Sequence, residues 1–540
     1  MQYQAYSKLA KSGDLSNLKD RAWYRFFEIL PGLLAWATLI LVVILSFSEP
    51  IFMAMFIILF DTYWFIKTVY LSLHLRSAFK RLRQNLKINW LERLKALPAS
   101  NYQLSSLSSW QDLYHLIVLP LYKEGLEVVT ATLEGLIRSD YPKTKMIVVL
   151  AKEESAGDGA KFVADSMARE YGNKFFKFMV VTHPANLPGE LAGKGSNATY
   201  AARQAKIEII DKLNIPYERV IVSNLDIDTV IPAQYFSLLT HLYLTTPNPT
   251  RASYQPVPLY TNNIWEAPAL ARVVAFAATF WHTIQQERPE RLTTFSSHSM
   301  SFQALVDVDF WQVNMVSEDS RIFWQCFFRY DGNYRVVPMF YPVSMDANVA
   351  PGFWRTMANI YKQQRRWSYG VENVPYFLFG FIKNKHVSKR KRWYYTFNIL
   401  ESFHSWSTNA LIIFFLGWLP VVAGGPEFGR TVLSLNLPRF TSMIMLLSMV
   451  GLISSAVLST ILLPPRPPQY GKYKYFLMII QWVFFPLTTI FLGAIPGLES
   501  QTRIMFKKYL GFWATPKSRF TQNEPVVASG RGERVRLDIS

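Results

Sequence analysis

Two patterns of hydrophobic positions divide the chain: long unbroken runs lie towards both ends, and short runs lie between them. Three long runs are continuous, at Ile29–Ser48, Ile51–Leu73 and Phe403–Val422. A fourth run is Phe440–Leu463 and a fifth is Tyr475–Pro496. A helix needs about 20 mostly apolar residues to cross the roughly 30 Å hydrocarbon core of a bilayer. The long runs therefore predict an integral membrane protein.

The first and last of these runs need separate comment. The first is not typical of a signal peptide, because it begins late, is long, and has no small-residue cleavage site before the second run. The fifth contains Pro486, which removes a helical donor and clashes with the preceding turn. We predict that this run bends at Pro486 and re-enters, which returns Gln501–Lys517 to the cytoplasmic side. Re-entrant backbone has to be packed on protein.

The region between the second and third long runs has a different rhythm. Short apolar runs, "HLIVLP", "KMIVVLA", "FFKFMVVTH" and "ERVIVSNL", alternate with helical patterns at Gly125–Arg138, Gly157–Tyr171 and Lys194–Ile210. Strands that alternate with helices of this length predict βαβ units on a mostly parallel sheet, with helices on both faces. In such α/β sheets ligands bind beyond the carboxyl ends of the strands, so candidate functional residues follow each strand.

Charge and cysteine content narrow the possible classes of protein. The formal net charge is +19, and its basic residues gather at Arg76–Lys95 and Lys383–Arg392, next to apolar runs. Juxtamembrane Lys and Arg mark the cytoplasmic side and attract anionic lipids. We therefore interpret the charge as membrane topology rather than as nucleic-acid binding. The single cysteine, Cys326, excludes an intramolecular disulfide framework and a Cys-rich metal site.

Paired carboxylates follow the fourth short run, in "NLDIDTV", where Asp226 and Asp228 are two positions apart. Alternate residues of an extended segment share a face, so both carboxylates point into one crevice. Two close negative charges are unfavourable unless a cation lies beside them. A hard divalent ion, Mg²⁺ or Mn²⁺, would neutralise them and bridge to a diphosphate. The alternative is a simple turn, in which Asp is common.

Two further motifs each allow a structural and a functional interpretation. "SEDS" places Glu318 and Asp319 where Ser317 or Asp319 could simply cap the following helix. "QQRRW", with Gln363, Arg366 and Trp367, could be a basic interfacial helix with Trp at head-group depth.

Taken in their order along the chain, the motifs favour the functional interpretation over the structural one. Asp-x-Asp, Glu-Asp and Gln-x-x-Arg-Trp, after an α/β pattern and between membrane runs, resemble the family 2 glycosyltransferases, and more narrowly the membrane-integrated branch that contains cellulose and hyaluronan synthases. The C-terminal "FWATPK", Phe512–Lys517, resembles that branch's gating loop, with Ala514 in place of Val. The matches extend over residues 115–517. The resemblance implies a GT-A type nucleotide-sugar-binding domain inserted between transmembrane helices.

The resemblance also implies roles for the matched residues. Asp226 and Asp228 would hold Mg²⁺ or Mn²⁺, with Asp226 beside the metal or the ribose. Asp319, with Glu318 beside it, would be the general base that takes the proton of an acceptor hydroxyl. Further donor contacts would come from Arg366 and from the lid residues Thr515 and Lys517, and the acceptor contacts from Gln363 and Trp367.

Other matches are looser. "LPLYKEG" makes Tyr122 and Glu124 candidate contacts to the nucleotide base, and "AKEES" offers Glu153 or Glu154 after the second strand. "LAGKGSNA" places Lys194 near the diphosphate or donor sugar, although a solvated lysine at a helix start is the alternative. The family's acceptor region is replaced here by "FSSHSMSFQALVDVDFW", so the acceptor stays open. Arg365 is expected to face lipid phosphate.

The expected activity is transfer of a sugar from a nucleotide-diphospho sugar, a UDP-sugar in our prediction, with inversion, to a growing β-linked polysaccharide. The alternative keeps the chemistry but transfers one sugar to a lipid acceptor, as in ceramide glucosyltransferases. A more distant alternative is a transporter or channel with a nucleotide-sensing domain. The expected location is a bacterial inner membrane with the catalytic domain cytoplasmic, and the expected partners are the donor, the acceptor and membrane lipids, with no nucleic acid.

These patterns predict the following division of the chain. In order, we expect a cytoplasmic amphipathic segment at 1–27, two transmembrane helices at 28–74, a basic interfacial linker at 75–111, the glycosyltransferase domain at 112–345, interfacial helices at 346–394, C-terminal transmembrane helices at 395–499, a gating-loop-like segment at 500–522 and a flexible tail at 523–540.

Overall fold

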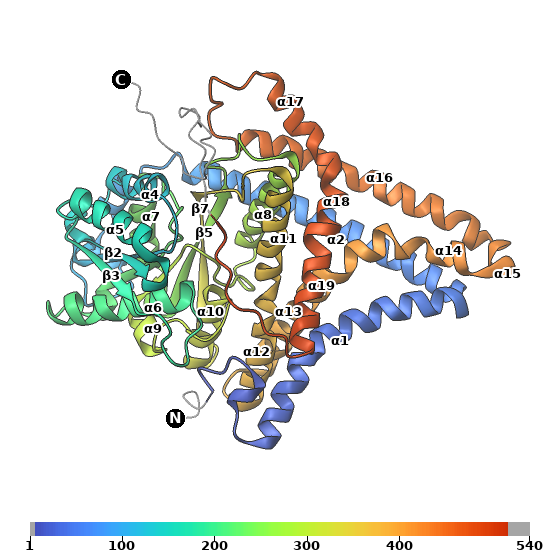
Figure 1. Cartoon of the computed structure of the whole chain (residues 1–540), viewed down its shortest axis with the longest axis horizontal. Coiled ribbons are helices and arrows are strands. Elements are labelled where there is room, and N and C mark those ends of the chain that lie inside the picture. The colour runs from blue at the N-terminus through green and yellow to red at the C-terminus, as the bar shows by residue number, and fades with distance from the viewer. Residues whose placement is uncertain (1–5, 517–540) are drawn as a thin grey trace, which may run out of the picture.

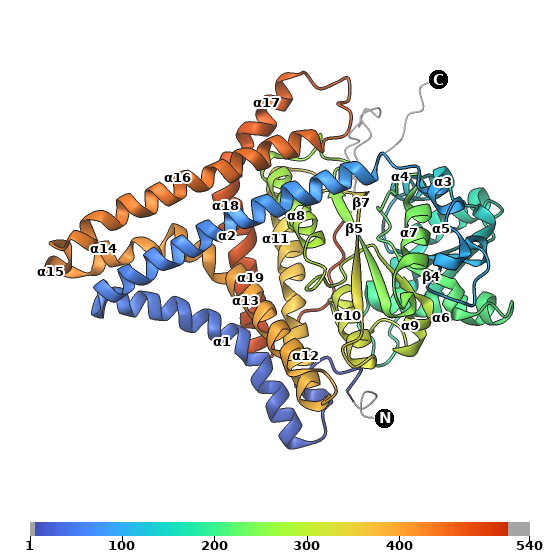
Figure 2. The same ribbon diagram turned by 180° about the vertical axis from the view of Figure 1, so that it is seen from behind.

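The computed structural model of the chain describes residues 6–516, except for the side chains of residues 448–450 and 452–454. An α/β part and a group of long helices lie side by side, and the long helices project away from the α/β part (Figure 1). The view from behind shows the same arrangement (Figure 2).

One seven-stranded sheet forms the centre of the α/β part. Its strands are β1 (Tyr114–Leu121), β2 (Met146–Glu153), β3 (Lys177–His183), β4 (Val220–Asn224), β5 (Ala252–Tyr260), β6 (His298–Ser301) and β7 (Arg335–Met345). Their order is β3-β2-β1-β4-β6-β5-β7. Neighbouring strands pair in parallel except for β6, which is antiparallel to both β4 and β5. The expected mostly parallel sheet is confirmed, although the sequence patterns had indicated only its first four strands.

Helices cover both faces of this sheet. The helices of one face are α4 (Leu126–Arg138), α5 (Gly157–Tyr171) and α7 (Tyr235–Thr245), and those of the other are α6 (Lys194–Ala205), α9 (Phe302–Asp307) and α10 (Glu318–Arg329). Alternate residues of β1 serve the two faces: Leu116 and Val118 pack in one core, and Ile117 and Leu119 in the other. Burial on both sides explains why these strands are apolar at nearly every position.

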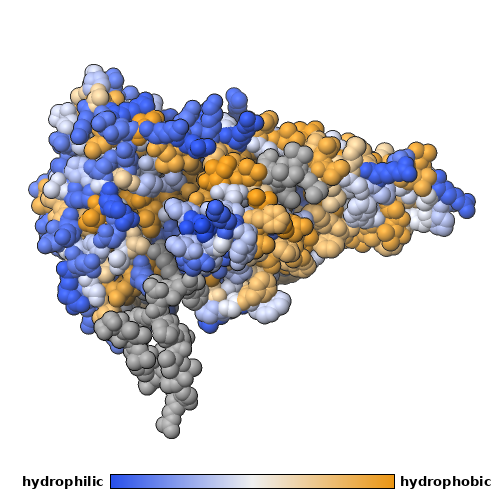
Figure 3. Space-filling view, turned by 90° about the horizontal axis from the view of Figure 1, so that it is seen from above, coloured by the Kyte–Doolittle hydropathy of each residue, from blue (hydrophilic) through white to orange (hydrophobic). Residues whose placement is uncertain are grey.

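Three helices in the described part of the chain are long and apolar enough to cross a membrane: Leu18–Ser48 (α1), Pro50–Asn85 (α2) and Tyr473–Met505. The pair Lys389–Phe414 (α13) and Leu416–Ala423 bends by 49°, and it makes a fourth if it is counted as one span. The apolar stretch Val432–Leu447 is shorter. These helices present the apolar surface that lies between the hydrophilic α/β part and the hydrophilic far tip (Figure 3).

Two helical hairpins make up most of this projection. α1 and α2 form one, and α13, α14 (Leu419–Ala423), α15 (Gly425–Gly429) and α16 (Val432–Ile461) form the other. Both hairpins turn at the tip farthest from the sheet, and α2 and α16 both run back towards the α/β part (Figures 1 and 2). α16 packs along α2, so the two hairpins lie against each other.

The last apolar run differs from its expected bend at Pro486. It is one helical segment of 33 residues, Tyr473–Met505, with α17 (Tyr473–Ile480), α18 (Phe485–Thr489) and α19 (Ile495–Met505) joined by short 3₁₀ and π turns. Pro486 is tolerated because it is the second residue of α18, in the first turn, where a helix has no use for its missing N–H. The segment runs across the hairpins rather than along them (Figures 1 and 2).

Both ends of this segment contact the α/β part. Near its start, Tyr475 meets Trp265 edge to face, with ring centroids 5.4 Å apart. Beyond its end, the hydroxyl of Tyr369 accepts a hydrogen bond from the backbone N–H of Leu510 at 3.1 Å. Residues 506–516 therefore lie against the α/β part although the helix is not sharply bent.

The stretch expected to be a basic interfacial linker is helical and partly buried. α2 continues as far as Asn85, and α3 (Trp90–Lys95) follows it. Trp90, Leu94 and Trp110 pack in the core beneath α7. Residues 90–113 thus add to the α/β core, because their apolar side chains find cover there rather than in lipid.

Candidate active site

A lysine joins two of the predicted acidic motifs at the carboxyl ends of the strands. Lys194 is the first residue of α6, Asp226 follows β4, and Asp319 lies in the first turn of α10. The Lys194 Nζ is 2.5 Å from Asp226 Oδ1, and it donates to both carboxylate oxygens of Asp319 at 2.9 and 3.0 Å. Lys194 and Asp319, which are 125 positions apart in the chain, therefore meet, and Asp226 joins them at the same ammonium group.

The ion pairs of Lys194 with Asp226 and Asp319 are largely buried. The side chain of Lys194 is 11% exposed. Burial by itself lowers the pKa of Lys194, but the carboxylates of Asp226, Asp319 and Glu318 more than offset it and raise the pKa. Lys194 is therefore a fixed positive charge at neutral pH, and the alternative of a solvated lysine is wrong.

The two adjacent acids of α10 have different environments. Glu318 is 2% exposed, and burial together with the neighbouring charge of Asp319 raises its pKa to about 8. A Cβ atom on Gly195 would lie 2.9 Å from Glu318 Cγ, so the glycine makes room for this side chain. Glu318 carries its proton at neutral pH, whereas Asp319 faces the Lys194 ammonium.

A buried histidine that the sequence patterns did not single out lies beside Asp319. The His298 Nδ1 is 3.8 Å from Asp319 Oδ1 and donates to the backbone carbonyl of Phe295 at 2.8 Å. Its Nε2 accepts from the indole N–H of Trp311 at 3.4 Å. Burial lowers the pKa of His298, so the ring is neutral and holds its proton on Nδ1. His298 therefore stands beside Asp319 without adding a charge.

Asp228 lies deeper than Asp226, at a junction with the end of β7. It is fully buried, and its Oδ2 accepts from the backbone N–H of Asp346 at 2.9 Å. The amide of Asn262 donates both to the Asp228 carbonyl at 3.0 Å and to Asp346 Oδ1 at 2.9 Å. Asp346 is thus a third carboxylate at this edge of the sheet, and no pattern in the sequence marked it.

The donor atoms here fit a hard divalent ion only in part. No group of three or more His, Cys, Asp or Glu side chains among the described residues has the geometry of a complete metal site. Mg²⁺ and similar ions are commonly held by one or two carboxylates plus the phosphates of a substrate. Asp226 and Asp228 fit that incomplete set, and the Lys194 ammonium already stands beside one of them as a cation.

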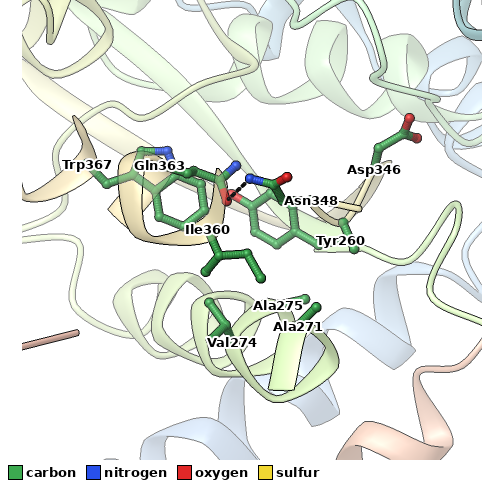
Figure 4. Close-up of a pocket in the computed structure, with 10 residues that line it drawn as sticks. Tyr260, Ala271, Val274, Ala275, Asp346, Asn348, Ile360, Gln363 and Trp367 are labelled. Atoms are coloured by element: carbon green, nitrogen blue, oxygen red, sulfur yellow. Dashed lines mark hydrogen bonds between the residues drawn. The ribbon is translucent and has the colours of Figure 1, made fainter. Parts of the chain in front are cut away.

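A small cavity of about 10 Å³ adjoins Asp346 (Figure 4). It is enclosed by the end of β5, by α8 (Ala269–Gln286), by the loop after β7 and by α11 (Phe353–Ser368). Gln363 and Trp367 of α11 line it together with Asp346 and Asn348, and Asn348 donates to Gln363 Oε1 at 3.4 Å. The two predicted acceptor contacts are therefore neighbours in one cavity wall.

Tyr260 connects this cavity with the acidic pair. Its ring lies 5.7 Å from that of Trp367, at an interplanar angle of 37°. Burial first, and then the charges of Asp226 and Asp228, raise the pKa of Tyr260, while Arg366 acts in the opposite direction. The Tyr260 phenol therefore lies beside the Trp367 ring and is influenced by the charges of the Asp-x-Asp motif and of Arg366.

The two adjacent arginines of α11, Arg365 and Arg366, have separate surroundings. Arg366 is covered by the Phe512 ring, with the guanidinium carbon 5.2 Å from the ring centroid. Its Nε is buried without a hydrogen-bond acceptor in the part of the chain that the structure describes. Arg365, which we expected to face lipid phosphate, instead donates to Glu499 of α19 at 2.8 Å. Glu499 also accepts from Tyr361 at 2.7 Å, so it ties α11 to α19.

The C-terminal segment passes over this group of residues. A Cβ atom on Gly193, the residue before Lys194, would lie 2.5 Å from Phe512 Cγ, so the Phe512 ring rests directly on that glycine. Thr515 is 7% exposed, and its hydroxyl has no hydrogen-bond partner among residues 6–516. Lys517 lies outside the described residues. Phe512 therefore lies over Gly193, next to Lys194, and over Arg366.

The remaining residues that we predicted to contact the nucleotide-sugar donor lie at or just after the ends of β1 and β2, and they form hydrogen bonds within the protein. Glu124 accepts from the backbone N–H of Tyr122 at 2.8 Å. Glu153 is buried at the end of β2 and accepts from Ser155 at 3.1 Å. Glu154 is exposed and accepts from the N–H of Ala185. Of Glu153 and Glu154, between which the sequence could not decide, Glu153 is the one that is buried at the carboxyl end of β2.

Comparisons with known proteins give weak likenesses. No family model matches the chain, and no curated protein matches it. Among solved structures, it is similar to the mannosyltransferase PcManGT from Pyrobaculum calidifontis in complex with GDP-Man and Mn²⁺, with 15% identity, a TM-score of 0.38, and coverage of 75% of this chain and 98% of that one. For S. aureus TarS 1-349 in complex with UDP the values are 12%, 0.35, 65% and 91%. At these TM-scores the likenesses carry no argument about function.

Proposed function

We propose that this protein is a membrane-embedded, inverting glycosyltransferase of family 2 type that transfers a sugar from a nucleotide-diphospho sugar, a UDP-sugar, to a growing β-linked polysaccharide. One observation carries the proposal. Asp226, Lys194 and Asp319 meet at one ammonium group, next to Asp228 and to the Tyr260–Trp367 wall. Asp226, Asp228, Asp319 and Trp367 also carry the resemblance to cellulose and hyaluronan synthases, and Lys194 is one of its looser matches, so sequence order and spatial convergence support the same chemistry.

The charged end of the site suits the donor. A divalent ion bound at Asp226 and Asp228 would offset the charge that builds on the departing diphosphate. Lys194 and Arg366 can each add a positive charge there, and the planar guanidinium can contact two phosphate oxygens at once. When the diphosphate attracts Lys194, the ammonium is drawn from Asp319, and that carboxylate becomes available as a base.

Asp319 is the group that would take the proton. An acceptor hydroxyl attacks the anomeric carbon, its proton passes to Asp319, and the bond to the diphosphate breaks with the electron pair leaving on oxygen. A single displacement of this kind inverts the anomeric centre. Glu318 keeps its own proton at neutral pH because of its raised pKa, so the two adjacent acids do not compete for this role.

The acceptor end and the C-terminal segment complete the proposal. The indole of Trp367 can stack on the C–H face of a sugar, and Gln363 can donate and accept hydrogen bonds to its hydroxyls. Phe512 lies over Gly193 and Arg366 and would exclude water from the donor side, with Thr515 as a further proposed donor contact. α11 is bound to the apolar segment by the Ser368–Ser500 hydrogen bond at 2.8 Å, which supports an acceptor that arrives from the membrane side.

The test is to incubate the purified protein with a panel of UDP- and GDP-sugars plus Mn²⁺, and to measure released nucleotide and product size. A high-molecular-weight product is the expected result. A product with one sugar on a lipid would replace the polymer by the glycolipid alternative. No turnover with any donor, by protein that binds nucleotide, would overturn the transferase proposal and favour a nucleotide-sensing transporter.

A further inference from the structure

A second cluster of positive charge lies where α8 begins, on the side of that helix that faces the last apolar segment. Arg272 of α8 is 6% exposed. Its Nε donates to the Gln481 side-chain oxygen at 2.6 Å, and its Nη1 donates to the Ala267 carbonyl at 2.5 Å. Gln481 lies in the short 3₁₀ turn Gln481–Phe484 that follows α17. The cluster therefore joins the α/β part to the apolar segment.

The donors of this cluster outnumber its acceptors. Within residues 6–516 Arg272 forms no ion pair with a carboxylate, and its second terminal nitrogen makes no hydrogen bond to protein. The Gln481 Nε2 is buried without a hydrogen-bond partner in the same range of residues. A buried donor without an acceptor, such as this amide nitrogen, is energetically costly. Burial also lowers the pKa of Arg272, as expected for a charge that no carboxylate offsets.

A second cation, Lys474, lies near this cluster. Lys474 of α17 forms no ion pair in the described part of the chain, and its Nζ lies 3.8 Å from the centre of the Tyr470 ring. Tyr470 in turn stacks on Trp265, two residues before the carbonyl that accepts from Arg272. An anion held by both Arg272 and Lys474 would offset the repulsion between their like charges.

The position of the cluster is that of a membrane boundary. Trp265 stacks on Tyr470 with ring centroids 6.1 Å apart, and the Trp265 N–H donates to the Pro464 carbonyl at 3.3 Å. Trp and Tyr collect at the head-group level of bilayers. Tyr473 and Phe476 of α17 are exposed on the apolar segment beside them. An anion that reaches Arg272 here comes from the level of the lipid head groups.

We propose that Arg272, Lys474 and the Gln481 amide bind the phosphate of an anionic membrane lipid. A phosphate fits this set of donors because a guanidinium contacts two phosphate oxygens at once, an ammonium adds a second charge, and a neutral amide completes the shell. Basic pockets between membrane-associated helices recognise lipid head groups in this way. The site is separate from the proposed transfer reaction and does not depend on it.

Occupation of this site has a structural consequence. The lipid phosphate would link α8 with α17, the first helix of the segment whose last helix, α19, carries Glu499 and Ser500 against α11. α8 also lines the cavity beside Trp367, through Ala271 and Ala275. A bound lipid would therefore fix one edge of the acceptor cavity and one end of the segment that leads to the C-terminal cover.

The experiment measures the thermal unfolding midpoint of the full chain in neutral detergent with dioctanoyl phosphatidylglycerol, dioctanoyl phosphatidylcholine or inorganic phosphate at equal concentrations. The variants are Arg272→Gln and Lys474→Gln, with Lys472→Gln as the control, since Lys472 is exposed and two residues from Lys474. We expect phosphatidylglycerol alone to raise the midpoint by several degrees in the wild-type protein and in Lys472→Gln, and much less in the other two variants.

Each other outcome decides against the site. An equal rise with phosphatidylcholine would mean that the lipid charge is not recognised. An equal rise with inorganic phosphate would replace the lipid by a soluble anion as the ligand. An equal loss in Lys472→Gln would mean diffuse surface charge. If Arg272→Gln does not fold, the comparison of Lys474→Gln with Lys472→Gln still decides, because both positions are outside the buried core.

Discussion

The two ends of the candidate active site are built from different chemistry. At one end, the carboxylates of Asp226 and Asp319 both lie within hydrogen-bonding distance of the Lys194 ammonium. At the other, Tyr260 and Trp367 form an aromatic wall around a cavity of about 10 Å³. The charged end joins α6, the loop after β4 and α10, whereas the aromatic pair comes from the end of β5 and from α11.

This difference matches the demands of the proposed reaction. A diphosphate that leaves gains negative charge, and preorganised charges that face it stabilise the transition state most. A sugar acceptor is neutral, and it is held by stacking and by single hydrogen bonds. Changes at the charged end should therefore reduce the rate strongly, and truncations at the aromatic end should reduce it modestly and selectively.

The largest effect is expected from Asp319→Asn. The amide cannot take the proton of the acceptor, so sugar transfer should fall about 10²–10⁴-fold, the usual size of a general-base contribution. Donor binding, measured calorimetrically, should stay close to that of the wild-type protein. The matched control is Asp309→Asn, the same change at a half-exposed surface position. Retained turnover in Asp319→Asn would remove this residue as the base.

Asp228→Ala should have the next largest effect. Loss of one of two carboxylates from the proposed metal site should weaken Mn²⁺-dependent donor binding about 10–100-fold, as loss of groups around a metal typically does. Titration of donor with Mn²⁺ and with a chelator measures it. If the chelator changes wild-type binding as little as it changes that of Asp228→Ala, the divalent ion has no part in the donor site.

Trp367→Ala tests the aromatic end by itself. Loss of stacking should reduce acceptor use about tenfold, which corresponds to about 1.4 kcal/mol, and should leave hydrolysis of the donor by water nearly unchanged. Trp354→Ala is the control, because Trp354 belongs to the same helix and is 81% exposed. Equal losses of transfer and of hydrolysis in Trp367→Ala would contradict the stacking role.

The smallest effect is a change in pH dependence. The folded-state pKa of Glu318 is raised from 4.5 to about 8, so between these values the folded state binds more protons than the unfolded state. The free energy of unfolding therefore falls as pH rises through this window. Glu318→Gln keeps a neutral side chain at every pH and should flatten this fall in thermal unfolding scans. A slope that is unchanged from pH 5 to 8 would mean that Glu318 is ionised in the folded protein.

Local sequence patterns predicted those elements of the fold that show a clear periodicity within one segment. The strands β1 to β4 and the helices α4, α5 and α6 follow the predicted runs closely, because a buried strand or an amphipathic helix has to show its period in the sequence. β5, β6 and β7 were not predicted. β6 has only four residues, and its polar side chains are buried by neighbours that come from distant parts of the chain.

The sequence by itself determined the acidic and aromatic motifs, their order, and the apolar runs long enough for a bilayer. The tertiary structure alone decided that Lys194 lies between Asp226 and Asp319, that His298 and Asp346 adjoin them, that Arg365 pairs with Glu499, and that the last apolar run lies across the hairpins. The reason is physical. Periodicity records the neighbours of a residue within one element, whereas a shared charge or a crossing angle depends on which elements pack together.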